Sequence, residues 1–191
     1  MKRILKVTML LVLMAWSVAI FTYTPIFIAG NPFKSVPLNV ERGGNLIDSS
    51  KIYSCSKQRD LSNIEYIVIH HTGVCYAGAP CNVAEYHSNN NGWTCGVGYH
   101  YYVMRDGSIV KLHRDSDLTA HAVGYNTKGI AVCFDGLKPT EKQLEAMARI
   151  TEDIMLKYNI KPLNIIGHGS VNATECPGFD VNELKVRLCR R

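Results

Sequence analysis

The chain has 191 residues, of which 47% are hydrophobic, and its formal net charge is +5. This length and composition fit one globular domain with an extension, and no internal repeat or low-complexity tract points to a fibrous or disordered protein. The positive charge suits an anionic partner such as cell wall, phospholipid or nucleic acid, but a solvated basic surface is the simpler interpretation. Because the chain has no RNA or DNA motif, a nucleic-acid partner is not expected.

Residues 1–30 predict a targeting segment. The chain begins with the basic stretch MKRILK, and no charged residue occurs between Val7 and Gly30. This apolar run is long enough to cross a bilayer, which takes roughly 20 residues, and long for a signal peptide, whose apolar region has about 7–15. Residues 17–19 resemble a cleavage site, so a cleaved signal is the alternative to the uncleaved signal anchor that we favour. In both cases the domain beyond residue 31 is exported, either anchored in the membrane or secreted.

Residues 31–60 contain two prolines and a Gly-Gly pair, and we interpret them as a linker or N-terminal extension of a domain that spans 61–191. The domain opens with IEYIVIHH (64–71), a run of β-branched residues that predicts a buried strand. NVAEYHSNN (82–90) predicts a short helix with Asn82 as its cap.

The rest of the domain alternates between strand and helix patterns. VGYHYYVMRDGSIVKL (97–112) predicts a hairpin that turns at Asp-Gly, and GIAVCFDG (129–136) predicts a second buried strand. Thr140 opens the clearest helix in a capping-box arrangement with Gln143. LNIIG (163–167) predicts a short strand, and VNELKVRLC (181–189) a last helix. Strands interleaved with helices predict an α/β fold, a central mixed β-sheet flanked by helices.

Seven cysteines in one short exported chain suggest disulfide bonds. Cys75 and Cys81 flank a short loop, YAGAP, and are the best candidates for a pair. Cys133 lies in a buried-strand pattern and is expected to be a free core thiol. The sequence leaves the pairing of three others open: Cys55, Cys95 and Cys189.

Residues 168–177, HGSVNATECP, carry the strongest chemical signal. His168 and Cys176 stand eight residues apart, and imidazole and thiolate are the side chains that zinc prefers. His70 and His71 could supply a third ligand, the number that leaves one position of a catalytic zinc open. Strand alternation puts the side chains of His70 and His71 on opposite faces of the sheet. His70 is the ligand only if the face that carries it meets the site. His71 would then orient a ligand or touch substrate. The combination favours a hydrolase, although each residue alone is weak evidence.

The chain resembles the type 2 N-acetylmuramoyl-L-alanine amidases, which include phage amidase endolysins and the peptidoglycan recognition proteins. The matching segments cover most of residues 64–180 in the family's order: IVIHHTG (67–73), NGWTCGVGYHYYVMRDG (91–107), AHAVGYNTKGIAVCFDG (120–136), PTEKQLEAM (139–147) and HGSVNATECPG (168–178). The resemblance implies the family's mixed sheet flanked by helices. It also implies a Zn²⁺ ion held by His70, His168 and Cys176.

The resemblance further implies hydrolysis of the amide between N-acetylmuramic acid and L-alanine, with peptidoglycan as the partner. Tyr99 matches the family's catalytic tyrosine. Thr174 stands where phage enzymes carry a catalytic lysine and amidase-active recognition proteins a threonine. Three further residues are expected to contact the substrate: His71, His121 and Asn126.

Two other functions stay open. The first is a non-catalytic peptidoglycan-binding or sensing protein on the same fold, but binding-only relatives typically lack the cysteine ligand that this chain keeps at Cys176. The second is a metal-free hydrolase with Cys176 as nucleophile, but the proline that follows Cys176 argues against it.

Other features of the chain also lead to expectations. The Cys75–Cys81 spacing resembles the short-loop disulfide of recognition proteins. Asn172 begins a glycosylation sequon, but its closeness to the expected zinc argues against a glycan there. We expect a monomer.

Overall fold

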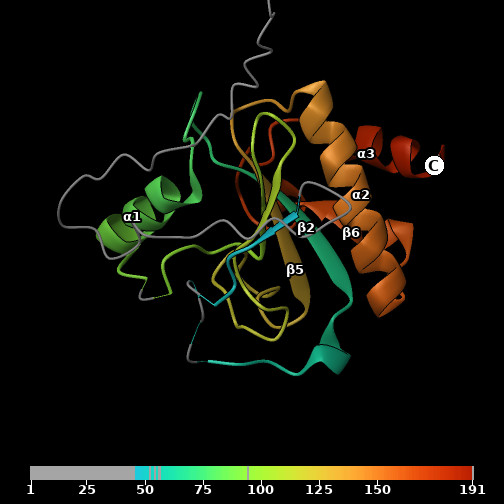
Figure 1. The fold of residues 1–191 in the computed structure, drawn as a ribbon. Coiled ribbons are helices and arrows are strands. Elements are labelled where there is room, and N and C mark those ends of the chain that lie inside the picture. Colours follow the sequence, from blue (N-terminus) through green and yellow to red (C-terminus); the bar gives the residue numbers. More distant parts are fainter. Residues whose placement is uncertain (1–45, 52, 54, 56, 94, 191) are drawn as a thin grey trace, which may run out of the picture.

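The computed structural model describes residues 46–51, 53, 55, 57–93 and 95–190 (Figure 1). The expected membrane segment, residues 1–30, lies outside the described residues, as does most of the expected linker. Among the residues described, no helix combines the length and the apolar character needed to cross a membrane.

One mixed sheet forms the centre of the fold, and it confirms the fold class expected from the sequence. Its strands lie in the order β1-β4-β3-β5-β2-β6. Their bounds are β1 Leu46–Asp48, β2 Tyr66–His71, β3 Tyr101–Val103, β4 Ile109–Lys111, β5 Gly129–Phe134 and β6 Ile165–Gly167. Among these strands, β3 and β4 pair antiparallel as the expected hairpin, and the other pairs run parallel. β1 comes from the segment interpreted as a linker or extension, and it adds an edge strand beside β4.

Helices cover both faces of this sheet (Figure 1). α2 (Glu141–Tyr158) and α3 (Val181–Leu188) pack on one face, and α1 (Pro80–Asn91) lies on the other. Thr140 caps α2 in the capping box that the sequence predicts. The expected cap of α1, Asn82, is wrong by three residues, because the helix begins at Pro80 with Ala79 in the cap position. Proline suits the first helical position, where its missing N–H is not needed.

The alternation of β2 divides its side chains between two cores. Ile67 and Ile69 belong to the core beneath α2 and α3. His70 is paired in register with Cys133 of β5, which belongs to the second core, on the α1 side. Since residues in register on neighbouring strands point to the same face, the ring of His70 lies on the α1 side and that of His71 on the other.

The structure corrects the expected disulfide. Cys75 and Cys81 are free, whereas Cys55 is bonded to Cys95, a pairing that the sequence left open. The loop between Cys75 and Cys81 is held by Asp135 instead, whose carboxylate accepts the N–H groups of Ala77 (2.7 Å) and Gly78 (3.2 Å). Short spacing alone does not orient two Cβ atoms for a disulfide, and Cys81 already belongs to the first turn of α1.

Candidate metal centre

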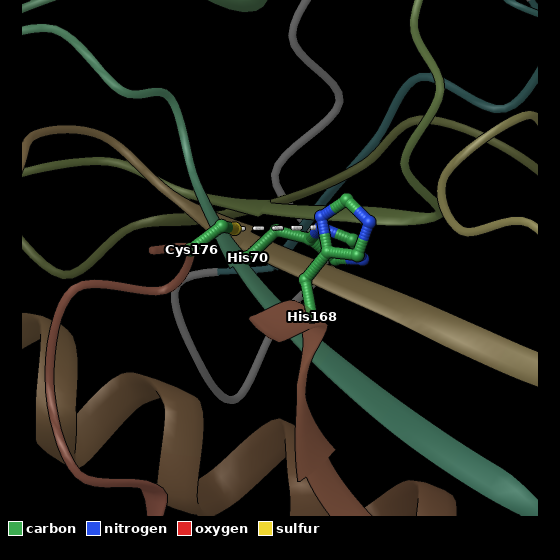
Figure 2. Close-up of side chains that lie close together, drawn as sticks. All are labelled: His70, His168 and Cys176. Atoms are coloured by element: carbon green, nitrogen blue, oxygen red, sulfur yellow. Dashed lines mark hydrogen bonds between the residues drawn. The ribbon is translucent and has the colours of Figure 1, made fainter. Parts of the chain in front are cut away.

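Three side chains with metal-binding chemistry meet at the carboxyl ends of β2 and β6 (Figure 2). Ile69 of β2 is paired with Gly167 of β6 in a parallel ladder, so the residues that follow, His70 and His168, emerge next to each other. Cys176 returns on the loop before α3. The candidate ligand atoms of these three residues all lie within 4.8 Å of one another, and Cys176 Sγ is 3.7 Å from His70 Nδ1. The structure therefore brings together the three ligands that the sequence predicts.

The loop from His168 to Cys176 depends on a glycine. The N–H of Gly169 donates to the carbonyl oxygen of Cys176 over 2.6 Å. A Cβ atom at residue 169 would lie 2.5 Å from the carbonyl oxygen of Thr174 and 2.9 Å from that of Cys176. Backbone can approach this closely only where no side chain intervenes.

We expect Gly169→Ala to displace Cys176, to weaken zinc binding and to destabilise the fold by about 1–3 kcal/mol, the usual cost of overpacking. Zinc titration and urea unfolding measure both effects. Ser170→Ala, an exposed neighbour in the same turn, is the matched control and should change neither. A Gly169→Ala protein with wild-type zinc affinity would show that the close approach is dispensable.

Burial sets the protonation of the cluster. His70 is 1% exposed, and its burial, with the neighbouring His121 and His168, lowers its pKa well below the usual value. Burial likewise lowers the pKa of His168. Burial raises the pKa of the Cys176 thiol to about 11, although the N–H of His71 acts in the opposite direction. Without a cation the site thus holds two neutral imidazoles and a neutral thiol.

This donor set fits a zinc ion. Zinc binds neutral imidazole nitrogens and a thiolate, and it displaces the thiol proton on binding. Each candidate ligand also has a hydrogen-bonding partner of the kind that orients metal ligands. His70 Nε2 lies 3.3 Å from His121 Nδ1, His168 Nε2 lies 3.0 Å from Asn172 Oδ1, and the His71 N–H donates to Cys176 Sγ over 3.4 Å.

Tyr99 stands beside this cluster. Its ring centroid lies 5.2 Å from that of His70 and 5.5 Å from that of His87 on α1. Burial raises the pKa of the phenol well above its usual value, and a hydrogen bond with the Cys133 thiol acts in the same direction. The phenol therefore stays protonated at neutral pH and can donate a hydrogen bond.

Thr174 is exposed on the loop that carries Cys176. Its Oγ1 accepts the N–H of Cys176 over 3.2 Å, which places the hydroxyl next to a candidate ligand. The closeness of Tyr99 and Thr174 to the cluster agrees with the roles expected for them, which stay predictions.

The three residues expected to contact substrate lie around the cluster in different ways. His71 is half-buried on the opposite face of β2, with Nδ1 3.4 Å from the carbonyl oxygen of Leu137. His121 is only 6% exposed and contacts His70 rather than solvent. Asn126 Oδ1 accepts the N–H groups of His121 and Ala122, both over 2.9 Å, and so closes the loop that carries His121. Contact of these residues with substrate stays a prediction.

Two residues near the site were missed by reasoning from the sequence. Asn172, noticed only as part of a sequon, has its Oδ1 3.0 Å from His168 Nε2. Its position four residues after a ligand in one loop is the signal that could have indicated this. Arg59 is buried, and its guanidinium donates to the carbonyl oxygens of Asp115 (2.8 Å) and Asn126 (2.8 Å). No local pattern predicts such long-range contacts.

Several buried histidines make the stability of the fold depend on pH. Burial lowers the pKa of His87 to about 4 and that of His121 to about 3. In the unfolded chain these side chains take up a proton near pH 6.5, whereas in the fold they stay neutral down to the lower values. Below about pH 6.5 the unfolded chain therefore binds more protons than the folded protein. The free energy of unfolding falls as a result when the pH is lowered toward about 4.

We expect the melting temperature of the chelator-treated protein to fall steadily between about pH 6.5 and pH 4, with each such histidine contributing up to about 1.4 kcal/mol per pH unit. His87→Asn, which can still accept the N–H of Gly98, should make the dependence on pH shallower. A melting temperature independent of pH over this range would contradict the assignment of neutral buried histidines.

Fold and site together define a class of protein: a mixed α/β domain whose sheet ends in a three-ligand His-His-Cys cluster, the pattern of a catalytic zinc centre. The family model described as N-acetylmuramoyl-L-alanine amidase (Amidase_2) matches residues 60–179, and the chain belongs to this family. The resemblance drawn from the sequence motifs is thereby confirmed.

Relatives from two groups are similar to the chain. Peptidoglycan-recognition protein SC2 of Drosophila simulans is 32% identical over 143 residues, which cover 68% of this chain and 77% of that protein. Among solved structures, the N-acetylmuramoyl-L-alanine amidase LysC from Clostridium intestinale URNW matches with a TM-score of 0.66 at 29% identity. The match covers 75% of this chain and 97% of the LysC chain. Bumblebee PGRP-SA shares the fold, with a TM-score of 0.58 at 24% identity. The match covers 71% of this chain and 90% of the PGRP-SA chain.

Proposed function

We propose that this protein is a zinc-dependent amidase that hydrolyses the amide between N-acetylmuramic acid and L-alanine of the peptidoglycan stem peptide. The observation that carries the proposal is the convergence of His70, His168 and Cys176 within 4.8 Å, with the Tyr99 ring at 5.2 Å from that of His70. Membership of the amidase family and the similarity to LysC support the choice of reaction.

The proposed roles follow from what each side chain can donate or accept. His70, His168 and Cys176 would hold the zinc ion, which when bound supplies Lewis-acid chemistry that polarises a carbonyl and activates water. The protonated phenol of Tyr99 can orient the attacking water or assist the transfer of its proton. The hydroxyl of Thr174 can donate a hydrogen bond to the developing oxyanion, but it cannot supply the positive charge of a lysine.

Release of stem peptides from purified muropeptides, with and without a chelator, tests the proposal. We expect cleavage by the zinc-loaded protein, its loss on chelation and its recovery when zinc is returned. No cleavage despite bound zinc would leave the non-catalytic binding protein as the better explanation. Cleavage that survives complete removal of metal would support Cys176 as a nucleophile, against which its pKa of about 11 counts because the thiolate is the reactive form.

We also propose that the domain is exported and remains membrane-attached through residues 1–30. The Cys55–Cys95 disulfide supports an oxidising compartment, since such bonds are rare in the cytosol. Mass analysis of the mature N-terminus distinguishes an anchored from a cleaved form. A mature chain that begins near residue 20 would contradict membrane attachment and show that the domain is secreted after cleavage of the signal.

A further inference from the structure

His121 is buried between the candidate metal centre and the interior, and it uses only one of its two ring nitrogens. Its Nδ1 lies 3.3 Å from Nε2 of His70, and the two rings meet edge to face with centroids 5.3 Å apart. Its Nε2 is buried and has no well-aligned hydrogen-bond partner in the described part of the chain, although the backbone of Gly129 lies close to the ring and acts to raise the pKa of His121.

The positions of the protons on the two rings decide which nitrogen of His70 can bind a metal. Each neutral imidazole carries one N–H and one lone pair, so either His70 donates to His121 or His121 donates to His70. If His121 donates, the proton of His70 sits on Nδ1, the atom that lies 3.7 Å from Cys176 Sγ, and this nitrogen cannot bind a metal. If His70 donates from Nε2, its Nδ1 lone pair faces Cys176 and is free to bind.

We propose that His121 is a positioning residue for the zinc ligand His70: it accepts the Nε2–H of His70 and thereby leaves Nδ1 of His70 to bind the metal. The proposal rests on the proposed function only in requiring that zinc binds at this site. In this arrangement His121 accepts at Nδ1 and carries its own proton at Nε2.

The loop that carries His121 is held from two sides. Asn126 Oδ1 accepts the N–H of His121, and the carbonyl of Asn126 in turn accepts from Arg59. On the other side, Asn172 Nδ2 donates to the carbonyl oxygen of Val123 over 3.5 Å, while its Oδ1 contacts His168. Gly129 lets the ring sit close to the backbone, because a Cβ there would lie 3.1 Å from His121 Cε1. The acceptor is therefore presented to His70 by a fixed support.

Two variants of the full-length protein separate hydrogen bonding from packing. His121→Phe keeps a ring but has no acceptor, and we expect a zinc affinity about 10–100-fold lower in chelator competition, the usual effect of removing the partner of a ligand. His121→Asn can place an amide oxygen near the position of Nδ1, and it should recover most of this loss. The melting temperature of each metal-free variant shows whether the fold persists.

Nitrogen-15 NMR of the zinc-loaded wild-type protein tests the same point without a variant, with His70→Asn to assign its signals. The expected spectrum shows His70 protonated at Nε2 and metal-bound at Nδ1. Protonation of His70 at Nδ1, or a folded His121→Phe protein with wild-type zinc affinity, would overturn the proposal. Wild-type protein that binds zinc but leaves muropeptides intact would defeat the proposed amidase activity alone, since the zinc affinities and the spectrum still decide the role of His121.

Discussion

Replacing Cys176 by serine should abolish zinc binding and muropeptide cleavage while the fold persists. The thiolate is the soft ligand of the cluster, and a serine hydroxyl loses its proton far less readily at neutral pH. Loss of a partner to a ligand already costs about 10–100-fold in affinity, so loss of the ligand itself should cost more than about 100-fold. The side chain is small and 7% exposed, which leaves little packing to disturb. Metal content and thermal unfolding of the metal-free variant measure both parts.

Cys189→Ser is the matched control, because Cys189 is a free, exposed thiol outside the cluster. It should bind zinc and cleave muropeptides as the wild type does. If Cys176→Ser kept full activity, Cys176 would not be a ligand, and both the zinc site and the distinction from binding-only relatives would have to be abandoned.

Tyr99→Phe should lower kcat by about 10²–10⁴-fold, the usual contribution of a group that assists proton transfer, without changing zinc affinity. The substitution removes the phenolic oxygen but keeps the ring that packs against His70 and His87. Steady-state kinetics on a defined muropeptide, together with zinc titration, separate a catalytic effect from loss of the metal.

Tyr86→Phe serves as the control for Tyr99→Phe, since Tyr86 also lies near His87 but is 62% exposed on α1. It should leave kcat unchanged. A Tyr99→Phe protein with wild-type kcat would remove Tyr99 from the catalytic residues and leave Thr174 as the candidate donor to the oxyanion.

The elements that sequence predicted well are those with a local physical signal. The β-branched run of β2 and the capping box at Thr140 act within a few residues, and both appear in the structure where expected. The start of α1 was misplaced because Asn82 and Pro80 both suit a helix beginning, and the proline is what the structure uses. β1 was missed because a three-residue edge strand depends on its partner β4, which lies far along the chain.

The cysteines show the same limit. Short spacing suggested a bond between Cys75 and Cys81, yet the structure joins Cys55 to Cys95 across 40 residues. The loop between Cys75 and Cys81 is held by hydrogen bonds to Asp135 instead. Pairing depends on where the fold places and directs each Cβ, and spacing along the chain carries little of that information.

By itself, the sequence determined the mixed α/β fold, because strand and helix patterns are properties of short segments. It also indicated His168 and Cys176 as candidate zinc ligands from their chemistry, whereas the choice of His70 as the third came from the resemblance to the amidase family. Only the tertiary structure decided which side chains support those ligands. His121 and Asn172 belong to different loops, and their contacts with His70 and His168 arise when β2 and β6 pair and the loops close over their ends. Hydrogen bonds of this kind depend on atomic positions and directions, which the packing of the whole domain sets.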